Sequence, residues 1–231
     1  SIVLLLAFVG GVYFAGYKLS VGSGTAYVAL AGVAAGVAAW LHWRRFQVPI
    51  TVAAGVLAVI SSLLLMLISA SPDVLRYIKP ISFVAGIVVF ALALRWDAAD
   101  TSRQTGKSDV AFWLHLLAAP LLVHPMFTML DVFSGSMNWL QGLAVVILYV
   151  VIGLVSLAID RRALMVSALV YVLYAFSTLL KLYGVVSLGF AMTALVIGAA
   201  LLLLSAFWHP CRQFVLGRFS LGVRQKLAPL R

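Results

Sequence analysis

Long apolar runs alternate with short polar segments along almost the whole chain. A hydrocarbon core of about 30 Å needs roughly 20 apolar residues in a helix, and eight runs have or approach that length. Apolar residues occupy all faces of these runs, which is typical of helices in lipid. The pattern predicts an all-α transmembrane bundle of about eight spans, at Ile2–Tyr17, Thr25–Leu41, Pro49–Ile68, Ile78–Leu94, Val110–Leu130, Trp139–Ile159, Ala163–Leu180 and Val185–Trp208. The last two spans are separated by three residues, so one long bent helix is the alternative.

Composition supports this prediction. The chain is 65% hydrophobic and 10% charged, whereas soluble domains carry about 25% charged residues. A net charge of +10 can indicate nucleic-acid binding, but the charges lie in short loops and no nucleic-acid partner is expected. The single cysteine, Cys211, excludes an internal disulfide and a CxxC site. The chain begins at Ser1 within an apolar run that lacks signal-peptide features, so we expect that some N-terminal residues have been trimmed.

The basic residues predict an orientation. Twelve of the sixteen Lys and Arg residues fall in alternate loops and the tail, on one side of the predicted bundle. Such a bias places that side of the bundle, and both chain ends, in the cytoplasm. Five tryptophans are expected to form an interfacial belt at the same boundary: Trp40, Trp43, Trp96, Trp113 and Trp208.

The two halves of the chain share sparse polar marks. Arg44-Arg45 and Arg161-Arg162 each precede an apolar run that ends in a similar hydroxyl-rich segment, Ser61-Ser62-Leu-Leu and Ser177-Thr178-Leu-Leu. We therefore interpret residues 1–210 as one polytopic membrane domain with possible parallel repeats at 1–95 and 108–210. Chance similarity between low-complexity runs is the alternative.

The fifth predicted span has an unusual polar content. Pro120 and Pro125 remove backbone donors and are expected to bend the helix. Ser108 is expected to cap its start. Its candidate binding or proton-relay residues are His115, His124, Thr128 and Asp131. The last three share a face at i, i+4 and i+7; a kinked helix that reaches the interface is the plainer reading.

A second polar stripe follows one face of the seventh predicted span. Ser167 begins it, and its candidate site residues are Tyr171, Tyr174, Thr178 and Lys181. Unpaired hydroxyls in lipid cost energy, so this face should meet a cavity or another helix. We expect Asp131 and Lys181 to pair and the two spans to be neighbours. Interhelical packing is the alternative for this stripe. The small residues Gly32 and Gly36 of span two, together with Gly55 of span three, indicate close helix packing.

The remaining patterns favour no cofactor, metal or catalytic site. Asp97 and Asp100 could bind a divalent cation, but beside Arg103 and Lys107 they are expected to form ordinary surface ion pairs. Three histidines, at 42, 115 and 209, approach the inner boundary without forming a recognisable haem pair. The tail at 211–231 interleaves apolar and basic residues and is expected to be a short interfacial helix on anionic lipid. A docking site for a protein partner is the alternative for this tail, and the sequence does not identify such a partner.

Three segments resemble polytopic inner-membrane proteins of proteobacteria that have no assigned activity. They begin at Ser108-Asp-Val-Ala-Phe-Trp, Arg161-Arg-Ala-Leu-Met-Val and Ser205-Ala-Phe-Trp-His-Pro. The resemblance implies a bacterial inner membrane and assigns no functional residue. Two functions therefore stay open: a small-molecule or lipid carrier with a polar site between spans five and seven, or a non-catalytic scaffold or complex subunit whose polar faces serve packing. An enzymatic function is not indicated.

Overall fold

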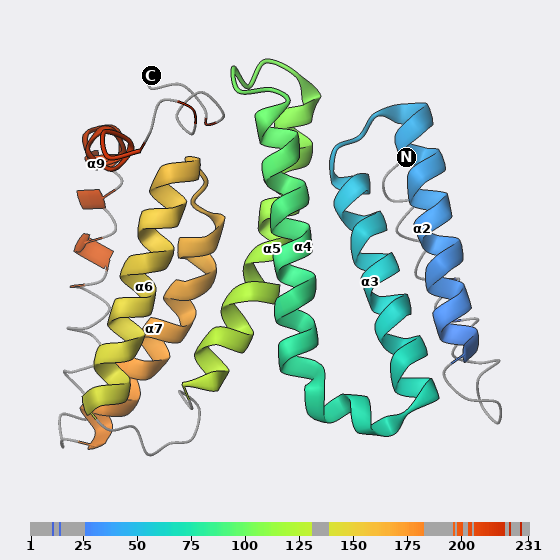
Figure 1. Ribbon diagram of the computed structural model, residues 1–231, viewed down its shortest axis with the longest axis horizontal. Helices are drawn as coiled ribbons and strands as arrows, with labels where there is room; N and C mark the ends of the chain where they lie inside the picture. The colour runs from blue at the N-terminus through green and yellow to red at the C-terminus, as the bar shows by residue number, and fades with distance from the viewer. Residues whose placement is uncertain are drawn as a thin grey trace. The chain divides into compact units, whose positions relative to one another are not determined.

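The computed structural model describes residues 11, 14, 26–130, 139–182, 196, 198–200, 203–204, 206–219, 222 and 227. Within these ranges all the regular elements are helices (Figure 1). The chain divides into two compact units, residues 1–118 and 119–231, each taken by itself below. The unit boundary falls inside a helix, whereas the two predicted repeats meet at the preceding loop. The predicted duplication stays a prediction.

In its described residues, unit 1 contains four helical elements and the first half of a fifth. The bounds are α2 Ala26–Phe46, α3 Ile50–Ala70, the 3-10 helix η1 Pro72–Tyr77, α4 Ile78–Ala98 and α5 Gly106–Met129. Helix α5 continues through Pro120 and Pro125 and enters unit 2, which also contains α6 Trp139–Ile159, α7 Ala163–Leu182 and α9 Trp208–Leu216.

Four helices in the described part of the chain are long and apolar enough to cross a membrane. They are Ile50–Ala70, Pro72–Ala98 (η1 with α4), Gly106–Met129 and Trp139–Ile159. The predicted count of eight spans is therefore not reached. Two predicted spans, 2–17 and 185–208, lie wholly or mostly outside the described residues. The other two coincide with α2, which ends in Arg44 and Arg45, and with α7, whose apolar part is described only over Ala163–Ala175.

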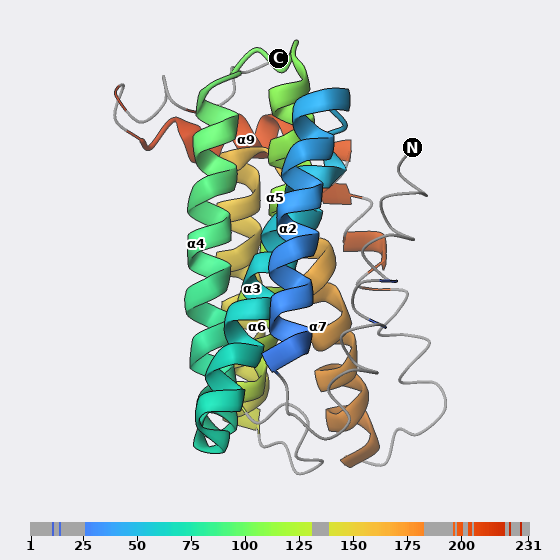
Figure 2. The same ribbon diagram turned by 90° about the vertical axis from the view of Figure 1, so that its right-hand side faces the viewer.

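Helices α2 and α3 pack side by side through small residues (Figures 1 and 2). A methyl group added at Gly36 would lie 3.1 Å from Cγ2 of Val59, and one at Gly55 would lie 3.2 Å from Cβ of Ala39. The Ser62 hydroxyl of α3 bonds within its own helix, since its Oγ donates to the Ala58 carbonyl at 2.7 Å. The predicted close packing of these two spans is confirmed, because the helices approach closely at Gly36 and Gly55.

Several helices extend beyond their predicted ends into charged sequence. Helix α2 runs to Phe46, through the arginine pair that was expected in a loop, and turns at Gln47, where φ is 53°. Helix α4 runs to Ala98 and α5 starts at Gly106. Apolar length alone underestimates such helices, since polar residues continue a helix once it leaves the hydrocarbon.

In unit 2, α6 and α7 pack against each other and α9 crosses the end of α6 (Figures 1 and 2). Helix α6 ends with Asp160 in the left-handed region at φ 57°. The Arg161 amide then donates to the Ser156 carbonyl at 3.0 Å, as in a Schellman motif. This tight turn starts α7 at Ala163. Trp208, expected in the interfacial belt, is instead buried at 4% exposure in a core with Leu157 and Met165.

Candidate functional site

An apolar groove of about 600 Å³ lies in unit 1 between the α2–α3 pair and α4. The close approach of α2 and α3 forms one wall, with Gly36 and Gly55 at its base, and α4 supplies Val88, Val89 and Leu92. None of the described residues that line the groove carries a charge. Its one lining hydroxyl, on Thr51, donates to the Val48 carbonyl at 2.6 Å. The groove therefore suits an uncharged, apolar ligand.

Three tryptophans gather at one end of this groove. Trp43 and Trp96 meet edge to face with ring centroids 6.2 Å apart, and Trp40 lies beside them in the lining. The Arg44 guanidinium carbon sits 5.0 Å from the Trp40 ring centroid. Indole rings and arginines at the end of an apolar helix are typical of the level of lipid head groups. The sequence indicated the tryptophan belt here, but not the groove.

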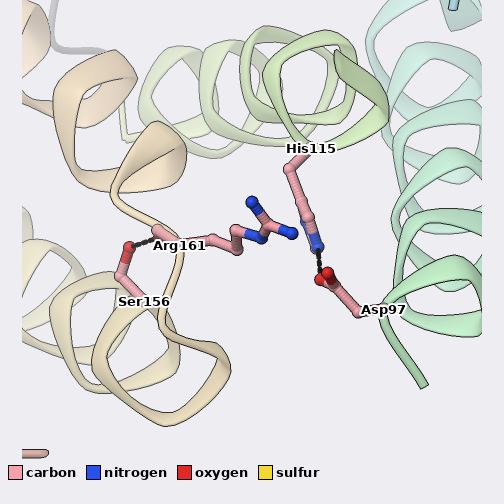
Figure 3. Close-up of polar contacts among 4 residues, drawn as sticks. All are labelled: Asp97, His115, Ser156 and Arg161. Atoms are coloured by element: carbon pink, nitrogen blue, oxygen red, sulfur yellow. Dashed lines mark hydrogen bonds and ion pairs between the residues drawn. The ribbon is translucent and has the colours of Figure 1, made fainter. Parts of the chain in front are cut away.

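His115 lies in unit 1 and is fully buried against Asp97 (Figure 3). Its Nε2 atom is 2.7 Å from Asp97 Oδ2, and the edge of Phe90 packs on its ring at 5.4 Å between centroids. Asp97 was expected in a surface ion pair, and it contacts this buried histidine because α4 continues past its predicted end and turns the carboxylate toward α5. Asp97 and His115 both lie within a few turns of the same short loop, and this proximity was the sequence signal for their contact.

Asp100 also departs from the predicted surface pairing. Its carboxylate accepts hydrogen bonds from the Thr105 hydroxyl at 2.6 Å and the Thr105 amide at 2.8 Å, with further ones from Gln104 and Ser102. The Thr105 hydroxyl, followed by these other donors, holds the pKa of the Asp100 carboxyl well below its usual range. The residue that caps α5 is Thr105, which accepts from the Lys107 amide at 3.3 Å, rather than the predicted Ser108.

In unit 2 the polar stripes of α5 and α7 meet, as predicted. His124 Nδ1 is 2.8 Å from the Tyr171 hydroxyl, and Phe127 stacks on the Tyr171 ring at 5.0 Å. Thr128 donates to the Pro125 carbonyl at 3.0 Å, and Thr178 donates to the Tyr174 carbonyl at 3.0 Å. Two of the predicted site residues thus contact each other, and two bond to their own helices.

The predicted ion pair at the outer end of these stripes lies outside the described residues. Asp131 is not described, and of Lys181 only the helical backbone is. Tyr174 is 40% exposed.

A polar cluster that the sequence did not predict holds α9 against the turn between α6 and α7. Trp208 Nε1 donates to Asp160 Oδ1 at 2.6 Å, and the Nε atom of the buried Arg212 lies 3.8 Å from the same oxygen. The Arg162 guanidinium carbon stacks 4.6 Å from the Trp208 ring centroid. Ser156 Oγ donates to the Arg161 carbonyl, which closes the turn (Figure 3). The missed signal was Arg212, a charge within the apolar arc of the tail.

These features define a helical integral membrane protein with four candidate spans in its described part. No protein-family model matches the chain, and no curated protein or solved structure matches it. The resemblance to proteobacterial inner-membrane proteins therefore rests on the three short segments alone.

Proposed function

We propose that this protein binds a lipid acyl chain in the groove between the α2–α3 pair and α4, and so belongs to the lipid-carrier class. The observation that supports this proposal is an uncharged groove of about 600 Å³. Two of the helices that form it, α3 and α4, are candidate membrane spans. This volume falls within the range of about 300–1,000 Å³ that is typical of ligand sites.

The proposed site differs from the one expected between spans five and seven. In unit 2 four of the predicted site residues already have protein partners, since His124 contacts Tyr171 and the two threonines Thr128 and Thr178 bond to backbone carbonyls. The unit 1 groove, in contrast, is lined mainly by apolar side chains, which favour an apolar ligand. The three tryptophans at one end support a position of that end at the head-group level, from which a chain would enter from lipid.

The proposed setting is a bacterial inner membrane, with the arginine-rich loops and the basic tail in the cytoplasm. The biased distribution of Lys and Arg supports this orientation. We propose that α2 and α7 also cross the membrane, in addition to the four candidate spans. Both are helices of sufficient length, at 21 and 20 residues.

Two valines of α4 provide a matched test. Val88 lines the groove and Val84 does not, although they lie one turn apart and are 62% and 59% exposed. The purified full chain is loaded with phosphatidylcholine that carries a photoactivatable acyl chain, and loosely bound lipid is removed by detergent exchange. We expect Val88→Phe to lower the retained, cross-linked lipid severalfold, because the added ring occupies the groove, and Val84→Phe to leave it unchanged.

The position of the cross-link supplies a second readout. Labelled peptides should come from the lining of α2, α3 and α4. Equal retention by both variants, or labelling spread over all apolar helices, would show that the groove holds no more lipid than any other lipid-facing surface.

A scaffold without a ligand is the second candidate. The observation that favours it is the pairing of the α5 and α7 polar groups within the protein. On this proposal both variants retain equal amounts of probe, and the polar stripes contribute only to helix packing.

A further inference from the structure

A second groove, of about 460 Å³, lies in unit 2 between α6 and the segment that includes the end of α9. Five of its described lining residues are apolar or aromatic side chains from α6 and α9, and Arg218 is the one charged residue among them. The lining residues are Leu154, Val155, Ala158, Phe214, Val215, Arg218 and Phe219. An apolar groove with a single guanidinium at its edge has the two chemistries of a phospholipid, a chain and a charged head group.

The groove lies at the level where lipid head groups would meet the protein. Its α6 residues belong to the last turns of a candidate membrane span that ends at Ile159. Helix α9 crosses that end (Figure 2), as expected of a helix in the plane of the interface. Phe214 and Phe219 are 66% and 43% exposed, so their aromatic rings can contact lipid at the boundary between head groups and acyl chains.

The wall formed by α9 is fixed by contacts inside the protein. Asp160 accepts from Trp208 and faces Arg212, which is 1% exposed. These contacts hold the helix independently of lipid, so the groove exists before a ligand binds. A preformed site loses less ordering entropy on binding.

Arg218 keeps donors available for a ligand. Its guanidinium carbon lies 3.8 Å from the Phe214 ring centroid, and one Nη atom approaches the Phe214 carbonyl at 3.5 Å. The residue is exposed, and a guanidinium has five N–H donors in a planar fork that matches phosphate oxygens. Stacking on Phe214 orients that fork at the edge of the groove.

We propose that this groove binds one anionic phospholipid, with an acyl chain along α6 and the phosphate at Arg218. The site is separate from the acyl-chain groove of unit 1 and does not depend on it. It differs in chemistry as well, because the unit 1 groove is uncharged and should not distinguish lipids by head-group charge.

Native mass spectrometry of the full chain in neutral detergent tests the proposal. Dioleoylphosphatidylglycerol and dioleoylphosphatidylcholine are titrated separately, and the dissociation constant of the first bound lipid is compared. Arg218→Gln should weaken phosphatidylglycerol binding about fivefold, as expected for one arginine near an anionic head group, and should leave phosphatidylcholine unchanged. Ala158→Phe should weaken both lipids at this site by filling the groove.

Arg76→Gln is the matched control, because Arg76 is an exposed arginine of η1 that does not line the groove. The proposal is overturned if Arg218→Gln binds phosphatidylglycerol like the unaltered chain, or if Arg76→Gln weakens it equally. If Ala158→Phe elutes as aggregate in gel filtration, the exposed Arg218→Gln variant decides alone. Failure of the unit 1 groove appears separately, as equal probe retention by Val88→Phe and Val84→Phe.

Discussion

The α2–α3 pair and the α6–α7–α9 corner are held together in different ways. In the first, two glycines let the helix backbones approach, and the Ser62 hydroxyl of α3 bonds within its own helix. In the second, one carboxylate contacts an indole and a buried guanidinium from a helix 48 residues further along the chain. Lipid provides no hydrophobic force between helices. Close packing joins the two apolar helices, while a charged cluster joins the short helix α9 to its neighbours.

Mutation of the charged cluster should cost more stability than mutation of the α2–α3 contact. Asp160→Ala removes the acceptor of Trp208 and leaves Arg212 buried without this carboxylate, which costs about 3 kcal/mol. The lower end of the range for buried pairs applies because the Asp160 side chain is 20% exposed. Asp160→Asn should cost about half as much, since asparagine also tolerates a positive φ and keeps an acceptor for the indole.

Cys211 reports the undocking of α9. It is the single cysteine of the chain, and it packs against the core formed by Leu157, Met165 and Trp208. A loss of about 3 kcal/mol corresponds to roughly 100-fold faster maleimide labelling through local opening. Asp73→Ala, at an exposed aspartate of η1, should label at the original rate. Unchanged labelling of Asp160→Ala would show that α9 is held by other contacts.

The close packing of α2 and α3 should respond to added volume. Gly55→Val inserts a branched side chain where even a methyl group would lie 3.2 Å from Ala39 Cβ, and overpacking of this kind costs about 2 kcal/mol. Thermal unfolding of the detergent-solubilised chain should show a lowered midpoint. Gly153→Ala in α6 is the control, because no described side chain and no other described helix lies within 4 Å of a methyl group added there. A normal midpoint for Gly55→Val would mean that the helices separate at little cost.

The sequence predicts individual helices better than the contacts between distant ones. Helix α6 occupies the predicted residues, 139–159, because its apolar run is bounded by a polar segment and an arginine pair. The ends of α4 and α5 were misplaced, since hydropathy does not show that Asp97 faces His115. The contact between Asp160 and Arg212 depends on where α9 docks. Arg212 in the apolar arc of the tail was nonetheless a usable signal, because a charge at such a position needs a buried partner.

The smallest expected effect is the difference in stability between losing an interhelical and losing an intrahelical hydrogen bond in unit 2. Tyr171→Phe removes the hydroxyl that lies 2.8 Å from His124 and should cost about 0.6 kcal/mol, the average for such bonds in membranes. Thr178→Val removes a bond to its own helix, at the Tyr174 carbonyl, and should cost close to nothing. Chemical unfolding in mixed micelles measures the difference. A larger loss for Thr178→Val would mean that this hydroxyl serves a second partner, as a polar carrier site between α5 and α7 requires.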